Sequence, residues 1–224
     1  MLTGGLWQLG AAIAVFLASH SLATVPAVRR PAESALGRVG FTLAYSVLSL
    51  LLLAWVVAAA LAAPYVPLWP QAAWMRWLPV LLMPWACMLA AVGLAAPNPF
   101  SIGPGGHGFD PARPGILRLT RHPVLWALAL WAGVHLVVNG NLAALLLFGP
   151  LLVLALAGPR LLDAKRRRRL GEGEWRRLAH ATGRPGDGRA LLREMGWRPP
   201  AAGMLLYGVL ILLHPYVIGH NPLP

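Results

Sequence analysis

The chain has 224 residues, of which 58% are hydrophobic and 12% are charged, and its formal net charge is +12. This low polar content excludes an ordinary soluble domain and predicts a polytopic membrane protein. The single cysteine, Cys87, lies in an apolar run, which excludes an intrachain disulfide and a thiolate-based metal site. The first basic residue is Arg29. The N-terminus therefore lacks the positive region of a secretory signal, and we expect the first apolar run to remain as a transmembrane helix.

Six apolar runs are long enough to cross a hydrocarbon core of about 30 Å, which requires roughly 20 residues of helix. Clusters of proline, glycine and asparagine separate several of them. The runs cover residues 6–24, 41–63, 78–96, 119–138, 142–162 and 201–218. The sequence therefore predicts an all-α fold, a polytopic membrane helical bundle with about six transmembrane helices that forms a single membrane domain over residues 1–224.

The basic residues test this arrangement independently. Eighteen of the nineteen lie in or at the edges of the first, third and fifth connections between runs, and the remaining one, Arg76, lies in the second. By the positive-inside rule these three connections are cytoplasmic and both termini are outside. Topology alone accounts for the basic charge, so we expect no nucleic-acid partner.

Two connections contain aromatic residues that bear on the membrane. Tryptophans flank the second connection, as anchors at the headgroup level do; they are Trp69, Trp74 and Trp77. The basic cytoplasmic loop at 159–200 contains Trp175 and Leu178 among many arginines. This loop could lie along the inner leaflet as an interfacial helix. In the more common case, its arginines are solvated and keep the loop on the cytoplasmic side.

Four of the seven histidines lie in or near the apolar runs, where an ionisable group is costly and is a functional hypothesis by default. They are His20, His122, His135 and His214. His122 and His135 belong to the same run, but their separation of thirteen positions corresponds to about 220° around a helix and about 20 Å along it. The two rings therefore point to different faces and do not share one small site.

The histidines allow more than one chemistry. Two neutral imidazoles from different helices, apolar walls and no thiolate partner are the usual outline of a bis-histidine b-type haem site. Zinc usually takes three or four ligands, and a buried histidine can also simply hydrogen-bond across helices. Depth in the membrane leaves open which histidine would bind a haem together with His20. His20 lies in the cytoplasmic half of its run, nearer the level of His122 than that of His135.

Motifs along nearly the whole chain resemble the NnrU family. In order they are ASHSL around His20, APNPFS from Ala96, GILRLTRHP from Gly115, WAGVHLVVNGN from Trp131, LLFGP from Leu146, GPRLLDAKRRRRLGEGEW from Gly158 and the closing LHPYVIGHNPLP. The family is linked to denitrification, in the handling of nitrite and nitric oxide, and includes the plant 15-cis-zeta-carotene isomerase, which binds b-type haem. The resemblance implies a multi-pass protein of the bacterial inner (cell) membrane.

The resemblance also implies particular site residues. It assigns the axial ligands of haem b to His20 and His135, and it makes His122 a family-typical residue of undefined role. The implied partners are membrane lipid and either a lipophilic small molecule or nitric oxide. Of the two roles that follow, we place denitrification before haem-dependent cis-trans isomerisation of a lipophilic polyene.

Two other functions stay open. The RHP motif and the LGEGEW segment are also similar to membrane isoprenylcysteine and phospholipid methyltransferases, in which this region binds S-adenosylmethionine. The chain departs from that pattern, because Asp163 and Ala164 stand where paired glutamates are expected, and this weakens the case for cofactor binding. A third alternative is a non-catalytic membrane assembly factor with the basic loop as its docking surface.

Overall fold

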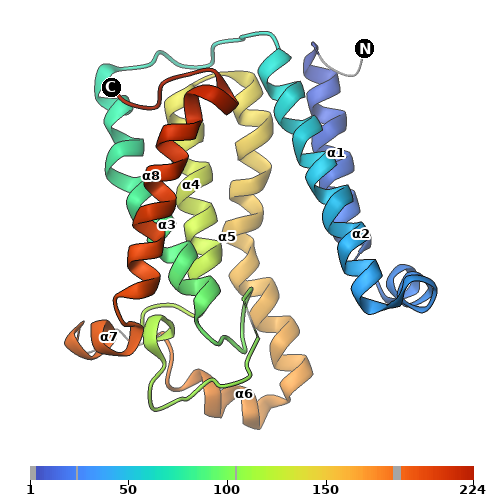
Figure 1. Ribbon diagram of the computed structural model, residues 1–224, viewed down its shortest axis with the longest axis vertical. Coiled ribbons are helices and arrows are strands. Elements are labelled where there is room, and N and C mark those ends of the chain that lie inside the picture. Colours follow the sequence, from blue (N-terminus) through green and yellow to red (C-terminus); the bar gives the residue numbers. More distant parts are fainter. Residues whose placement is uncertain (1–3, 24, 104, 184–187) are drawn as a thin grey trace. The chain divides into compact units, whose positions relative to one another are not determined.

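The computed structural model describes residues 4–23, 25–103, 105–183 and 188–224, and these residues form helices joined by loops (Figure 1). The α-helices are α1 (Leu6–Leu22), α2 (Pro26–Ala62), α3 (Trp77–Ala95), α4 (Pro123–Asn139), α5 (Leu142–Leu170), α6 (Glu172–Ala179), α7 (Gly188–Met195) and α8 (Arg198–Ile218). Two short 3-10 helices are η1 (Ala73–Arg76) and η2 (Gly115–Arg118). The predicted all-α class is confirmed.

Each of the six predicted apolar runs corresponds to an α-helix. Four helical segments are long and apolar enough to cross a membrane, namely α2, η1 with α3, α5 and α8, while α1 and α4 are shorter apolar helices. The helix α4 begins at Pro123 rather than at Leu119, because proline suits the first turn of a helix and the residues before it form η2. The helix α5 continues beyond the apolar run to Leu170.

The chain forms two compact units. Unit 1 comprises Met1–Pro70 and Gly140–Leu147, and unit 2 comprises Gln71–Asn139 and Phe148–Pro224. The boundary passes through the first turns of α5. Each unit is described by itself.

In unit 1, α1 packs along the second half of α2. Leu9, Ala12 and Ile13 of α1 are buried together with Val56 and Ala59 of α2. The spacing of these α1 residues places them on one helical face, and the two alanines allow the helix backbones to approach closely.

The helix α2 changes direction at Gly37, whose φ of 72° and ψ of 163° are not helical. Glycine adopts this conformation without the steric cost that a Cβ atom imposes. The polar first part of α2, which contains an ion pair between Arg29 and Glu33, is thereby separated from its apolar second part.

In unit 2, α3 packs against both α4 and α8. Small residues make both contacts close. A Cβ atom on Gly93 of α3 would lie 2.8 Å from a side-chain atom of Pro123 in α4, and one on Gly203 of α8 would lie 2.5 Å from the Cα atom of Met88 in α3. These contacts leave no room for larger side chains, as is usual where membrane helices pack tightly.

The arginine-rich end of unit 2 has an apolar core of its own. Phe100 is fully buried there with Leu117, Trp175 and Leu178, and its ring meets the Trp175 ring edge to face, at a centroid distance of 5.2 Å. The helix α6 therefore directs its apolar face into the protein. Because the side chains of Trp175 and Leu178 are buried in the protein, they are not available to enter the inner leaflet. A helix with a solvated outer surface therefore describes α6 better than an interfacial helix does.

We expect Gly203→Ala to lower the free energy of unfolding by about 1–3 kcal/mol, the usual cost of overpacking, because the new methyl group would meet the α3 backbone. The matched control is Gly208→Ala, on the same helix, where nothing lies within 4 Å of the added Cβ. Tryptophan fluorescence during unfolding in detergent measures both variants. Equal stability of the two would contradict the α3–α8 contact.

Candidate functional site

His20 lies in the last turn of α1, in unit 1. Its Nδ1 atom is 2.8 Å from the backbone oxygen of Phe16, one turn earlier. A carbonyl oxygen only accepts, so Nδ1 carries the proton and Nε2 carries the lone pair. The imidazole packs against the Phe16 ring at a centroid distance of 4.3 Å and meets the edge of the Tyr45 ring at 5.6 Å.

His135 lies on α4, in unit 2, and has the same arrangement. Its Nδ1 atom donates a hydrogen bond of 2.8 Å to the backbone oxygen of Trp131, again one turn earlier. The rings of Trp131 and Phe148 flank the imidazole at centroid distances of 5.4 and 5.1 Å. Both predicted haem ligands thus lie between aromatic rings in apolar helices.

The shared geometry has a chemical consequence. In each ring Nδ1 is engaged, and Nε2 has no hydrogen-bond partner among the described residues. An Nδ1–H bond to a carbonyl group fixes the ring orientation and raises the basicity of Nε2, which is how metal-binding histidines are usually supported. Both imidazoles are therefore suited to bind iron through Nε2.

His214, on α8, also has its Nδ1 engaged, through a hydrogen bond of 2.7 Å to the backbone oxygen of His220. Within the described part of the chain, no three or more His, Cys, Asp or Glu residues are grouped as a metal site would require.

His122 lies in different surroundings, just before α4. Its Nε2 atom is 2.9 Å from one carboxylate oxygen of Asp163, and a guanidinium nitrogen of Arg121 is 2.9 Å from the other. The structure thus brings His122 together with a carboxylate of α5 and with no other predicted site histidine. As expected from sequence, it lies at the opposite end of α4 from His135.

Further polar groups extend this arrangement. The side-chain amide of Asn98 donates to the backbone oxygen of Arg121 at 2.9 Å, and its oxygen accepts from the backbone N–H groups of Phe100 and Ser101. Arg166 donates to the backbone oxygen of Ser101 at 3.4 Å. We call these residues the Arg121 cluster: Asn98, Ser101, Arg121, His122, Asp163 and Arg166.

Asn98, Ser101 and Arg166 were not predicted from the sequence as members of a site. The available signal was the segment APNPFS, in which an asparagine and a serine directly follow an apolar run. Asn98 is fully buried and Ser101 is 2% exposed. Polar residues buried to this degree are normally hydrogen-bonded and have a structural or functional role.

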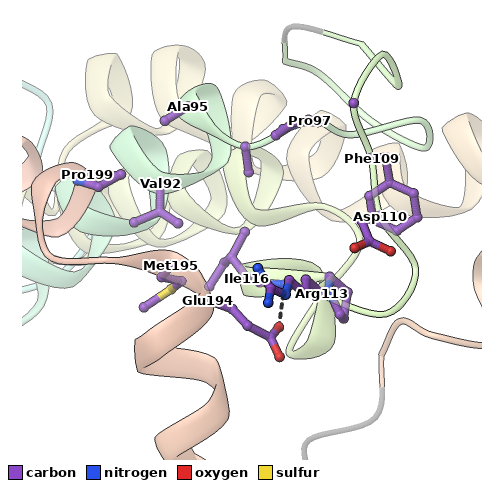
Figure 2. A pocket seen from close by; sticks show the side chains of 14 residues that line it. Val92, Ala95, Pro97, Phe109, Asp110, Arg113, Ile116, Glu194, Met195 and Pro199 are labelled. Atoms are coloured by element: carbon purple, nitrogen blue, oxygen red, sulfur yellow. Dashed lines mark hydrogen bonds between the residues drawn. The ribbon is translucent and has the colours of Figure 1, made fainter.

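A pocket of about 320 Å³ lies near the same end of unit 2 (Figure 2). Apolar residues of α3 and η2 line one part of it, and Glu194 of α7 lines another. The carboxylate of Glu194 accepts from the backbone N–H of Gly115 at 2.9 Å and from Arg118 at 2.7 Å. Both of its oxygens are therefore used to join α7 to η2.

Exposed ion pairs neutralise part of the positive charge of the arginine-rich segment. Hydrogen bonds from Arg167, together with Arg176, lower the pKa of Glu172 to about 2, and Arg177 lowers the pKa of Glu174. Both carboxylates therefore remain charged well below neutral pH. Exposed pairs of this kind contribute little to stability.

We expect Asp163→Asn to destabilise the protein, because it leaves His122 and Arg121 without their carboxylate. Removing one partner of a fully buried pair costs about 3–5 kcal/mol; since Asp163 and Arg121 are 24% and 30% exposed, we expect about 1–2 kcal/mol. The control Glu172→Gln removes an exposed carboxylate and should leave the unfolding midpoint unchanged. Equal effects of the two substitutions would show that the Arg121 cluster is not structural.

Comparison with known proteins bears on the whole chain. No curated protein and no solved structure matches it. The family model described as NnrU protein matches residues 8–222, a range that includes both units, His20, His135 and the Arg121 cluster. The chain belongs to the NnrU family of membrane proteins.

Proposed function

We propose that this protein binds b-type haem through His20 and His135 and acts in denitrification, in the metabolism of nitrite and nitric oxide at a bacterial inner membrane. The haem proposal rests mainly on the hydrogen bonding of the two imidazoles, which is the same in both. In both, Nδ1 donates to the carbonyl group one turn earlier and Nε2 is left for a metal. Membership of the NnrU family supports the biological role.

The surroundings of the two histidines suit a haem. Phe16 and Tyr45 lie beside His20, and Trp131 and Phe148 lie beside His135. These rings give the imidazoles flat apolar neighbours, and a haem site is tuned by its apolar surroundings and by hydrogen bonds to its axial ligands. The chain thereby provides orientation, apolar surroundings and two neutral nitrogen ligands.

When bound, ferrous haem would supply a coordination site for nitric oxide once one histidine has moved away. His135 is held by a hydrogen bond to Trp131 of its own helix, and His20 by contacts of Nδ1 with the Phe16 carbonyl oxygen and, at 3.4 Å, with Ser19 Oγ, both in α1. A change of side-chain rotamer would therefore free either ring without unfolding a helix. This makes exchange of one axial ligand compatible with the fold.

Cis-trans isomerisation of a lipophilic polyene is the second candidate, with the same two histidines as ligands. The observation in its favour is the large apolar surface of the helices. Only 11% of the most apolar stretch of α2 and 6% of that of α8 is buried in the protein. A substrate dissolved in the bilayer could reach such a protein directly. The methyltransferase alternative gains less support, because both carboxylate oxygens of Asp163 are engaged by Arg121 and His122.

We expect the full chain, purified in detergent from haem-replete cells, to show a Soret band that sharpens on reduction with dithionite. His20→Ala and His135→Ala should each abolish most of the band, because each removes an Nε2 ligand. The controls are His107→Ala, in an exposed loop, and His122→Ala, whose Nε2 is already engaged by Asp163; both should retain most of it. Absorption spectra at equal protein concentration give the comparison.

Rescue by imidazole distinguishes loss of a ligand from loss of the fold. Adding imidazole to His135→Gly should restore the Soret band, because the free base can occupy the space left by the side chain. Wild-type protein that purifies colourless from haem-replete cells would refute the haem proposal.

Nitric oxide separates the two proposed roles. We expect it to shift the Soret band of the dithionite-reduced wild type, while a 15-cis polyene incubated with the same protein stays unchanged. The polyene is analysed by chromatography after extraction. Isomerised polyene together with a spectrum that nitric oxide does not alter would favour the isomerase and contradict the denitrification role.

A further inference from the structure

The Arg121 cluster has more positive than negative charge. It contains two guanidinium groups, on Arg121 and Arg166, and one carboxylate, on Asp163, which leaves a formal surplus of one positive charge when His122 is counted as neutral. Asp163 is shared by Arg121 and His122. Among the described residues, Arg166 has no acidic partner within ion-pair distance, and its hydrogen bond to the backbone oxygen of Ser101 is long, at 3.4 Å.

Several polar atoms of the cluster are buried without a hydrogen-bond partner in the described part of the chain. They are Ser101 Oγ, Arg121 Nε, His122 Nδ1 and Arg166 Nε. The residues Ser101 and His122 are themselves only 2% and 4% exposed. Such groups are rare in folded proteins because each one carries the cost of lost hydration. Three of the four atoms can donate a hydrogen bond whatever the state of the histidine.

The cluster is also held in place from several sides. Asn98 joins the backbone of Arg121 to that of Ser101, and the guanidinium of Arg121 lies over the Trp175 ring, 5.7 Å from its centre. Asp163 and Arg121 are 24% and 30% exposed, so solvent reaches part of both side chains. The unpartnered donor atoms are buried but are already held in position, which lowers the entropic cost of binding a ligand that enters from the exposed side.

We propose that the Arg121 cluster binds a phosphoryl group. Arginine forks and a serine hydroxyl are the side chains that recognise phosphate oxygens best, and a tetrahedral group with three terminal oxygens can accept from Ser101, Arg121 and Arg166 together. The two oxygens of Asp163 are already engaged, which limits their repulsion of an anion. This site lies at the other end of α4 from His135 and does not depend on haem.

The phosphoryl group has two sources that fit this place. The helix α5 leaves its apolar run just before Asp163, where the phosphates of lipid headgroups lie if the run spans the bilayer. The partly open side of the cluster would also admit free phosphate or a soluble phosphate ester. The experiment therefore has one arm for each source.

The test uses the full chain in dodecyl maltoside, a detergent without phosphate, and measures the unfolding midpoint as ligand is added, because a ligand that binds only the folded state raises it. In one arm sodium phosphate is compared with sodium chloride at equal ionic strength. In the other, dioleoyl phosphatidic acid is compared with dioleoylglycerol, which has the same acyl chains and no phosphate. The apparent Kd follows from the concentration dependence.

Three variants identify the site. Arg166→Gln should weaken binding at least about tenfold, because it removes a charge-assisted hydrogen bond. Ser101→Ala should weaken it by several-fold to about tenfold, and it keeps all charges. The matched control Arg169→Gln removes the same charge from an exposed position on the same helix and should bind as the wild type does.

Each outcome is decisive. Stabilisation of the wild type by phosphate identifies a soluble ligand, and stabilisation only by phosphatidic acid identifies a lipid headgroup. Either result supports the site if Arg166→Gln or Ser101→Ala weakens the binding and Arg169→Gln does not. The proposal is overturned if neither ligand stabilises the wild type. It is also overturned if Arg166→Gln and Arg169→Gln reduce binding equally, or if Arg166→Gln and Ser101→Ala both bind as the wild type does.

Discussion

The structure depends on one constraint, which is that the interior of a bilayer offers no water to a polar group. Every backbone N–H and C=O in an apolar run must then find a partner within the protein, and helices meet this requirement locally. The same constraint governs the histidines. His20 and His135 each direct Nδ1 to a carbonyl group of their own helix, so one ring nitrogen is satisfied without a second polar residue. The other nitrogen remains for chemistry.

At the arginine-rich end of unit 2 polar groups are satisfied in another way, by partners far away in the sequence. Asp163 binds Arg121 and His122 across more than forty positions, and Glu194 binds Arg118 across seventy-six. These bonds hold the connection between α3 and α4 against α5 and α7. Partial exposure to water keeps the desolvation penalty of these pairs below that of fully buried ones.

This contrast explains what could be predicted from the sequence. The apolar runs and the distribution of arginine depend on local composition, so the helices could be predicted before their packing was known. The non-helical Gly37 within α2 and the burial of Trp175 in the protein depend on tertiary contacts, as does the partnership of Asn98 with Arg121. Neither the spacing of apolar residues nor the distribution of charge gives the distance between segments that are far apart in the sequence. The Arg121 cluster could therefore not be predicted, although the motifs that contain its residues are visible in the sequence.

The structure also bears on which histidine of α4 is the better candidate for a metal ligand. Depth in the bilayer favours His122 as the partner of His20, whereas the family resemblance favours His135. The Nε2 atom of His122 is engaged by Asp163, and its other nitrogen is buried. An iron ion bound there would have to displace a carboxylate that is also paired with Arg121. His135 lies between two aromatic rings, and its Nε2 atom has no hydrogen-bond partner in the part of the chain that the structure describes. Hydrogen bonding therefore supports His135, and the RHP motif belongs with the charged end of the helix.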